Sequence, residues 1–339
     1  EGVLLCSSLG KEAADSVRFQ RILAEDLASR GFAVLRFDYL GTGDSAFAQT
    51  RENAVSNWVH SVAYAAEYLK SIGITGISVI AHRIGCLIAE VAVRETGSKF
   101  ERVVFIDPVL SGRLYLREQS ALFKIAVGID ATPPGTVSIV GALIAGGAAK
   151  ELSALALGER LADTERLFVL RAGEGNARVR AIVDGGGIAH TNIQQLNSTL
   201  SLPMPLAAAD EIVSWFDQRA PSAPATARPL YQLRARMPGE DADSGGVVET
   251  IEEIGPKGLF AIRSTPDGQV RRSGMVVLFC ATSIDPHIGP TREWVEMGRR
   301  IAADGHEALR WDREGLGNSP PVQRNQWPRI YRRAEIADV

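Results

Sequence analysis

The chain has 339 residues, of which 45% are hydrophobic and 23% charged, so it can bury one large core or two of ordinary size. Its 37 basic and 40 acidic residues give a formal net charge of −3 and form no basic block, which argues against a nucleic-acid or anionic-membrane partner. The longest apolar stretch, 137–149, is too short for a membrane-spanning helix, which needs about 20 residues. Three scattered cysteines, Cys6, Cys86 and Cys280, argue against a disulfide framework or a zinc site and indicate buried thiols in a reducing, cytoplasmic compartment.

Apolar strands alternate with amphipathic helices through the first two thirds of the chain. We expect strands at 3–7, 32–38, 77–81, 102–107, 166–172 and 179–184, and helices at 19–27, 55–69, 84–93 and 208–218. Strands that are continuously apolar and separated by helices are typical of a parallel sheet with both faces covered. The predicted fold class is therefore α/β.

Two stretches interrupt this alternation. The segment 110–163 has no clear alternation of strand and helix and is long for a loop, so we interpret it as a cap over the carboxyl edge of the sheet. A peripheral decoration is the alternative. The segment 220–246 is rich in Ala, Pro, Ser and Gly, which is a linker composition. The sequence that follows, 247–264, predicts a β-hairpin.

An internal repeat links the two ends of the chain. Residues 16–45 align without a gap with residues 290–319, and nine of the thirty positions are identical. In the first copy the identical residues are Arg18, Ala28, Gly31, Leu35, Arg36, Asp38, Gly41, Gly43 and Ser45. Because the glycines and the aspartate all stay in register, the same helix–strand–turn unit is predicted to occur twice.

The order of these motifs resembles the α/β-hydrolase superfamily, in its serine-aminopeptidase and lysophospholipase-like branch. The resemblance rests on the "LGKE" loop after the first strand, on "LRFDYLGTGDS", and on the A-H-R-I-G sequence at 81–85. It implies an α/β-hydrolase-like domain at 1–219, with the cap insertion and with its first strands missing, and a truncated second domain of the same kind at 247–339. In that second stretch the H-x-G-P-x-R motif at 287–292 also resembles this branch.

The most specific element is the D-x-x-G-x-G-x-S turn formed by Asp38, Gly41, Gly43 and Ser45. The resemblance places this turn at the mouth of the site. Its role is predicted to be structural, because its glycines supply backbone angles that a side chain forbids.

At the nucleophile elbow the family has Gly-x-Ser-x-Gly on a strained strand-to-helix turn. The centre of this elbow is Arg83 here, and a guanidinium stays protonated and cannot attack a carbonyl. His82 and Cys86 are poor substitutes, since the first points elsewhere and the second lies in an apolar helix. Arg83 could grip an anionic ligand, or it could pair with carboxylates at the edge of the sheet. Both alternatives stay open at this point.

The other catalytic positions are also irregular. The resemblance suggests either Glu174 or Asp107 as the triad acid, and His190, expected after the last strand, as the triad histidine. The oxyanion loop would contain Ser7 and Ser8. No metal or organic cofactor is implied.

Three readings follow from the sequence. The favoured one is a two-lobed hydrolase-fold protein whose first lobe has lost nucleophilic catalysis, so that activity on an acyl ester, thioester or amide is expected in the second lobe. Within this first reading, the alternative is a non-catalytic lobe that binds a ligand or a partner. A dinucleotide-binding oxidoreductase is the remote reading, because 41–46 matches G-x-G-x-x-A after a strand. A third possibility is an unconventional catalyst that uses Cys86, or water activated by His190 and Asp107.

Overall fold

The computed structural model describes residues 1–97, 99–128, 132–158, 164–172, 179, 181, 183–184, 189–193, 205–221, 231–238, 246–268, 274–281 and 285–320. The chain divides into two compact units. Unit 1 comprises Glu1–Tyr39 and Thr50–Pro229, and unit 2 comprises Leu40–Gln49 and Leu230–Val339. Unit 2 thus includes a short stretch, residues 40–49, that in the sequence lies between two parts of unit 1.

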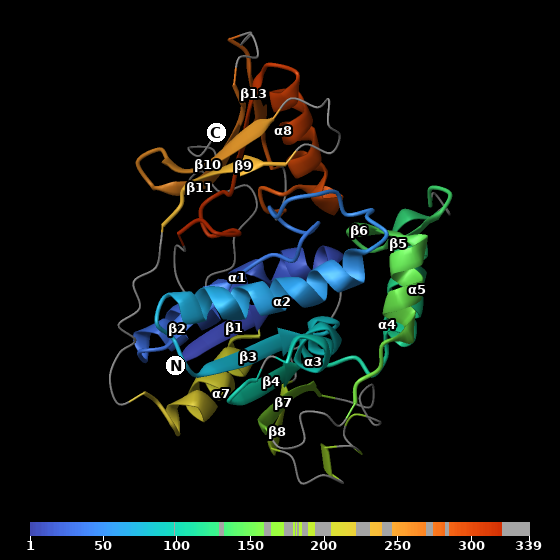
Figure 1. The fold of residues 1–339 in the computed structure, drawn as a ribbon, viewed down its shortest axis with the longest axis vertical. Helices are drawn as coiled ribbons and strands as arrows, with labels where there is room; N and C mark the ends of the chain where they lie inside the picture. The colour runs from blue at the N-terminus through green and yellow to red at the C-terminus, as the bar shows by residue number, and fades with distance from the viewer. Residues whose placement is uncertain are drawn as a thin grey trace. The chain divides into compact units, whose positions relative to one another are not determined.

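Unit 1 contains a six-stranded sheet with the order β2-β1-β3-β4-β7-β8 (Figure 1). Its strands are β1 (Gly2–Cys6), β2 (Ala33–Arg36), β3 (Ile77–His82), β4 (Arg102–Ile106), β7 (Glu165–Arg171) and β8 (Ala189–Ile193). Every neighbouring pair in this sheet is parallel. The prediction of a parallel sheet with helices on both faces is therefore confirmed.

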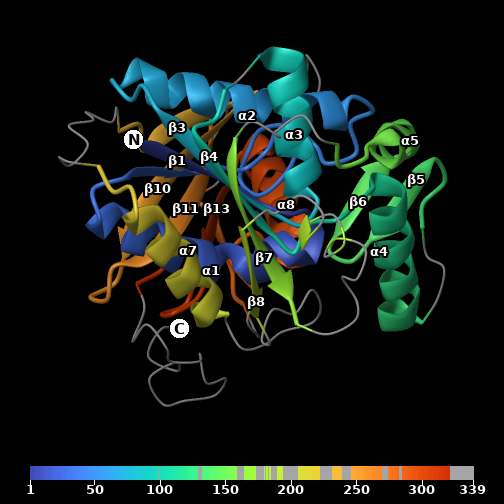
Figure 2. The same cartoon turned by 90° about the horizontal axis from the view of Figure 1, so that it is seen from below.

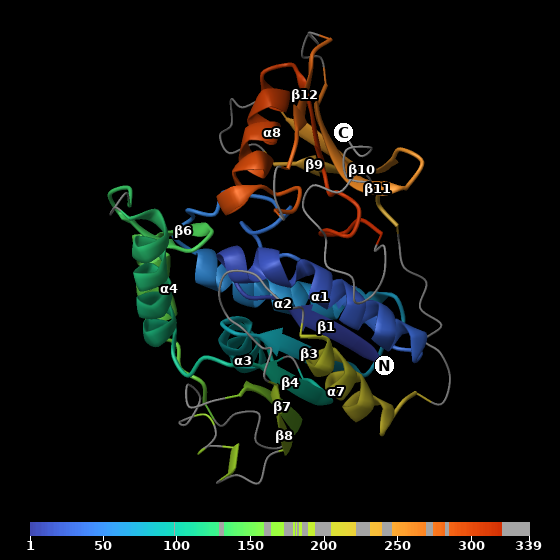
Figure 3. The ribbon, with the colours of Figure 1, turned by 180° about the vertical axis from the view of Figure 1, so that it is seen from behind.

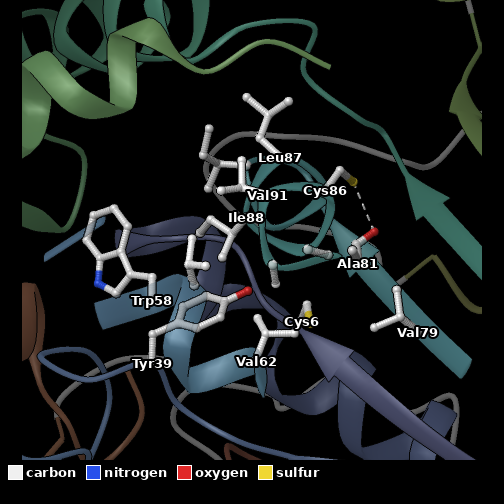
Figure 4. Packing of buried hydrophobic residues seen from close by; sticks show 14 of the residues in the cluster. Cys6, Tyr39, Trp58, Val62, Val79, Ala81, Cys86, Leu87, Ile88 and Val91 are labelled. Carbon is white, nitrogen blue, oxygen red and sulfur yellow. Dashed lines mark hydrogen bonds between the residues drawn. The ribbon is translucent and has the colours of Figure 1, made fainter. Parts of the chain in front are cut away.

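Among the described elements of unit 1, helices α1 (Gly10–Ser29), α2 (Ala54–Ser71), α3 (Gly85–Thr96) and α7 (Leu206–Asp217) cover the two faces of this sheet. Figure 2 shows α2 and α3 on one side and α1 and α7 on the other. Successive residues of a strand point to opposite faces, so β1, β2, β3, β4 and β7 each contribute to both hydrophobic clusters. In one of these clusters, Tyr39, Val62 and Ile88 pack beside Cys6 (Figure 4).

The segment predicted as a cap has its own secondary structure. It contains α4 (Gly112–Val127), an antiparallel hairpin of β5 (Thr136–Ile139) and β6 (Ala142–Ala145), and α5 (Gly146–Ala154). It follows β4, so it leaves the sheet at the carboxyl end of a strand. Its sequence gave no clear alternation because the strands are only four residues long.

The structure corrects the prediction for the last strand. The described positions 179, 181, 183 and 184 are helical, and the sheet ends instead with β8. Val179 and Val183 are both buried and lie four residues apart, which is helical spacing. The short run of apolar residues was compatible with either structure, and the helical period was overlooked.

Unit 2 is built on a five-stranded mixed sheet with the order β12-β13-β11-β10-β9. Its strands are β9 (Arg234–Met237), β10 (Val247–Ile254), β11 (Leu259–Pro266), β12 (Val276–Phe279) and β13 (Glu307–Trp311). The helix α8 (Glu293–Ala303) packs on this sheet (Figure 3). Only β12 and β13 pair in parallel, and β10 and β11 form the predicted hairpin.

Two features of unit 2 differ from expectation. The strand β9 lies within the segment predicted as a linker. It was not predicted as a strand because its sequence, "RARM", contains no apolar run, which an edge strand does not need. Cys280 is exposed, whereas Cys6 and Cys86 are buried as predicted.

The aligned glycines of the two repeat stretches have the same left-handed backbone geometry. The φ angles of three aligned glycine pairs agree within a few degrees: Gly31 90° and Gly305 95°, Gly41 82° and Gly315 79°, and Gly43 48° and Gly317 45°. These left-handed values explain why glycine recurs at each position. The turn hydrogen bond also recurs, since Ser45 N donates to Thr42 O and Ser319 N donates to Leu316 O, both at 3.0 Å.

Candidate functional site

The turn between β3 and α3 is tight and strained. Arg83 has a φ of 52°, in the left-handed region that costs a non-glycine residue about 1–2 kcal/mol. Its backbone N–H donates to Ile106 O at 3.0 Å, and the thiol of Cys86 donates to Ala81 O at 3.3 Å (Figure 4). A Cβ on Gly85 would overlap the backbone of β1, with Cys6 O at 2.7 Å. The turn therefore holds Arg83 at the carboxyl end of β3.

The guanidinium of Arg83 is surrounded by carboxylates from three other elements. Nε donates to Glu12 Oε1 at 3.0 Å, Nη2 donates to Glu118 Oε2 at 2.9 Å, and Nη1 lies 3.5 Å from Asp107 Oδ2. The side chains of Arg83, Glu12 and Asp107 are 5%, 4% and 2% exposed, whereas Glu118 is 40% exposed. We call these four residues the Arg83 cluster. Of the two alternatives left by the sequence, the geometry is that of carboxylate pairing.

Further polar groups complete the cluster. Glu12 also accepts hydrogen bonds from Ser8 Oγ at 2.6 Å and from Gln119 Nε2 at 2.9 Å. Asp107 accepts one from Arg171 Nη2 at 2.5 Å. Buried charges need such partners, because an unpaired ion in the interior costs several kcal/mol. Two arginines thus face three carboxylates, and α4 contributes Glu118 and Gln119.

The electrostatics of the cluster keep Arg83 charged. Burial alone would lower the pKa of Arg83, but Glu12, Asp107 and Glu118 together raise it above the usual value. Burial raises the pKa of Glu12 more than Arg83 and Ser8 lower it. A permanently protonated guanidinium offers no lone pair to attack an acyl carbon. At this turn Arg83 can only donate hydrogen bonds to anions. Its guanidinium is already paired with carboxylates of the chain itself.

The structure brings together only some of the predicted triad positions. Asp107 directly follows β4 and lies against Arg83, with a φ of 43°. His190 lies within β8 opposite Phe168, not after the last strand as predicted, and its Nε2 is 3.7 Å from Asp184 Oδ1. Three strand steps of about 4.8 Å each separate β8 from β3, so His190 is about 14 Å away across the sheet. Glu174 is outside the described residues.

The predicted oxyanion-loop serines take part in hydrogen bonds that fix the loop. Ser7 O accepts a hydrogen bond from Tyr39 OH at 3.0 Å, and Ser7 Oγ accepts one from Gln20 Nε2 at 3.0 Å. Ser8 Oγ donates a hydrogen bond to Glu12 Oε2. Both hydroxyls are thus engaged with neighbouring side chains.

The sequence reading missed Glu12, Glu118 and Gln119. Glu12 lies in the first turn of the helix that follows β1, at the same sheet edge as Arg83, and this placement was the signal that could have indicated it. Glu118 and Gln119 come from α4 in the cap, whose position could not be read from the sequence.

His82, next to Arg83, provides a pH-dependent prediction. Its side chain lines a small cavity with Ser16 and Gln20, and burial is the main reason why its pKa falls from 6.5 to about 4. The folded protein therefore binds a proton at His82 less readily than the unfolded chain does. The free energy of unfolding is unaffected by protonation of His82 above pH 6.5 and falls as the pH drops towards 4, because the unfolded chain takes up the proton first. At about 1.4 kcal/mol for each pKa unit, the loss is at most about 3 kcal/mol.

We expect the His82→Gln substitution to flatten the decline in the free energy of unfolding of unit 1 between pH 6.5 and 4. Urea unfolding at several pH values measures this slope. His60→Gln is the matched control, because His60 is exposed on α2. An acid slope that is the same in His82→Gln and wild type would contradict the assignment.

The residues of the predicted structural turn are divided between the units. Asp38 belongs to unit 1, whereas Gly41, Gly43 and Ser45 belong to unit 2. The G-x-G-x-x-A match at 41–46 lies in a turn closed by Gly41 N donating to Ala46 O, and the next helix, α2, begins only at Ala54. A dinucleotide-binding motif needs the helix to begin within it.

Two searches of the described part of the chain bear on other functions. No group of three or more His, Cys, Asp or Glu side chains there is arranged to hold a metal ion. No helix in the same residues has the length and apolar character needed to cross a bilayer.

Comparisons with known proteins relate part of the chain to hydrolases. Residues 5–132 match the sequence model of the family described as serine aminopeptidase, S33. Comparison with curated proteins finds no similar sequence.

Solved structures with a similar arrangement include an open-form lipase, with a TM-score of 0.47, 16% identity, and coverage of 65% of this chain and 90% of that one. A hydrolase from Oleispira antarctica has a TM-score of 0.45, 19% identity, and coverage of 65% and 91%. A variant of tomato methylketone synthase I with β-ketoheptanoate has a TM-score of 0.45, 13% identity, and coverage of 64% and 98%. The family match over residues 5–132 and the parallel sheet of unit 1 support the α/β-hydrolase superfamily.

Proposed function

We propose that unit 1 is a hydrolase-fold unit without nucleophilic catalysis, in which Arg83 occupies the position of the nucleophile. The supporting observation is the Arg83 cluster. A left-handed residue at a strand-to-helix turn is the geometry that presents a nucleophile in this fold. Here the side chain at that turn is a buried cation held by Glu12, Asp107 and Glu118.

The residues around the turn do not supply a substitute. Burial raises the pKa of the Cys86 thiol well above its usual value, so the reactive thiolate is suppressed. His190 is about 14 Å from β3 across the sheet, beyond hydrogen-bond reach of a nucleophile at position 83. Asp107 is paired with two arginines. The unconventional catalyst considered from the sequence is therefore not supported.

The class of reaction in this proposal is hydrolysis or transfer of a carboxylic ester, thioester or amide. We place any such activity in the second lobe, for which 247–339 would be the N-terminal part. The matching backbone of the two repeat copies supports this tandem arrangement. The alternative, a unit that binds an anionic ligand or a partner, is less favoured because chain carboxylates already surround Arg83. The free cysteines support a reducing, cytoplasmic location.

A fluorophosphonate labelling experiment tests the proposal. We expect the full chain to acquire no adduct on any serine or cysteine in residues 1–229, because the part of unit 1 that the structure describes assembles no activated nucleophile. Mass spectrometry of the digested protein locates adducts, and an active serine hydrolase in the same tube confirms that the reagent works. We also expect Arg83→Ser to stay unlabelled, since the histidine is remote. A wild-type adduct on Ser7, Ser8 or Cys86 would refute the proposal.

A further inference from the structure

Residues 40–49 carry a structural role that goes beyond the proposed function and does not depend on it. They leave unit 1 after Tyr39, belong to unit 2, and return to unit 1 at Thr50. The interactions that follow all lie within unit 2.

The carboxylate of Asp44 is held by two cations of unit 2. Its Oδ2 lies 2.6 Å from His287 Nε2, and its Oδ1 accepts a hydrogen bond from Arg310 Nη1 at 2.8 Å. The side chain of Arg310 is 0% exposed and also donates to Glu249 Oε1 at 2.9 Å. Charge-assisted hydrogen bonds of this kind are among the strongest in proteins. Both oxygens of Asp44 are thus bound to side chains of unit 2.

Two further arginines hold the backbone of the same turn. Arg292 donates to Gly43 O and to Ser45 O, each at 2.7 Å. Arg299 donates to Asp44 O at 2.5 Å and to Ser45 O at 2.9 Å. Three successive carbonyl oxygens, from residues 43 to 45, therefore accept guanidinium hydrogens. The planar, forked guanidinium makes such double contacts, which a lysine ammonium cannot reproduce.

The charges around Asp44 are balanced. His287, Arg292, Arg299 and Arg310 are matched by Asp44, Glu249, Glu296 and Asp312 in direct contacts. His287 has a carboxylate at each ring nitrogen, with Asp312 Oδ2 2.9 Å from Nδ1, so both nitrogens carry hydrogen. Burial opposes this charge, but Asp312 and Asp44 raise the pKa of His287 to about 10. His287 is therefore a structural cation here.

The internal repeat shows that a carboxylate at this position is particular to the first copy. The residue aligned with Asp44 is Asn318, whose backbone N–H donates to Asp312 Oδ2 at 2.7 Å. The two glycines that precede each of these positions are matched in φ. One of the differences between the copies thus falls on the side chain that the cations of unit 2 contact.

We propose that residues 40–49 are a latch, a turn that unit 2 recognises in two ways: His287 and Arg310 bind the carboxylate of Asp44, and Arg292 and Arg299 bind the backbone oxygens of the turn. The partner of this site is a segment of the same chain. Because the latch is joined to the chain of unit 1 at both of its ends, it gives unit 2 two covalent connections to unit 1 in addition to the one at residue 230.

Hydrogen exchange in the full chain tests the latch. We expect Asp44→Asn to increase amide exchange in residues 40–49 by tenfold or more and to increase exchange near His287 and Arg310. Peptides from β3 and β4 of unit 1 are expected to exchange as in wild type. Asp304→Asn, which removes an exposed carboxylate at the end of α8, is the matched control.

A second variant covers the case in which Asp44→Asn does not fold. Arg292→Lys keeps the charge and loses the forked contact, so we expect a smaller rise, about three- to tenfold, confined to 40–49. The proposal is overturned if exchange in 40–49 is unchanged in both folded variants. It is also overturned if the rise in either variant is no larger there than in β3 and β4. Size-exclusion chromatography of wild type is expected to show that the latch closes within a monomer, and a dimer that exchanges the turn would contradict this.

Discussion

Replacement of Arg83 by methionine is expected to lower the free energy of unfolding by about 3–5 kcal/mol. Methionine is similar in length and fills the space, but it leaves the buried carboxylates of Glu12 and Asp107 without their shared cation. Removing one partner of a buried ion pair costs this much because the remaining charge stays desolvated. Urea unfolding, with hydrogen exchange in unit 1 peptides to assign the transition, measures the loss.

Two comparisons identify the cause of that loss. The double variant Arg83→Met with Glu12→Gln is expected to recover part of the stability, because it removes one stranded charge. The deficit of the single variant is also expected to shrink as the pH falls, since burial already raises the pKa of Glu12 and protonation removes its charge. Arg94→Met, at an exposed pair with Glu95, serves as the control and should change stability by about 0.5 kcal/mol or less. A loss below about 1 kcal/mol for Arg83→Met would contradict the role of the cluster.

The second large effect is expected at Gly85. A Cβ at this position would overlap the backbone oxygens of Ser7 and Cys6, which belong to a central strand and its loop and cannot easily shift. We expect Gly85→Ala to cost at least about 2 kcal/mol, in the range known for overpacked cores. Thermal and urea unfolding measure the change.

Gly76→Ala is the matched control for this substitution. At Gly76 the nearest atom to an added Cβ is Glu101 Cγ at 3.5 Å, an ordinary contact with a flexible side chain. Equal stability losses for the two alanine variants would show that the close approach of α3 to β1 does not require a glycine at position 85.

Much of the architecture could be predicted because it depends on local patterns. The parallel strands of unit 1 are continuously apolar, since both faces of the sheet are covered. The turn at Arg83 could be placed because a strand, a glycine and an apolar helix follow one another within 79–93. The recurrence of glycine at aligned positions has a physical reason, because these glycines have left-handed angles that other residues avoid.

The partners of Arg83 could not be predicted, because they depend on how distant segments meet. Glu12 is 71 positions from Arg83 in the sequence and Glu118 is 35 positions away. A single glutamate on an amphipathic helix usually faces solvent, and nothing in the sequence of α4 distinguishes Glu118 from such a residue. The same holds for Asp44, whose contacts with His287 and Arg310 span more than 240 positions. Strand β9 was missed for another reason, since an edge strand needs no apolar run.

In the proposed hydrolase ancestry, the Arg83 cluster also has an evolutionary consequence. A single mutation back to serine would leave an interior with three acids and one fewer base, so the revertant would be selected against before it could regain any reactivity. Glu12 and Glu118 would have to be lost first, and each of those changes alone would in turn expose Arg83 to the penalty of incomplete neutralisation. The ion pairs thus make the loss of the nucleophile hard to reverse. Every single substitution towards the ancestral site is destabilising, so several substitutions would have to occur together.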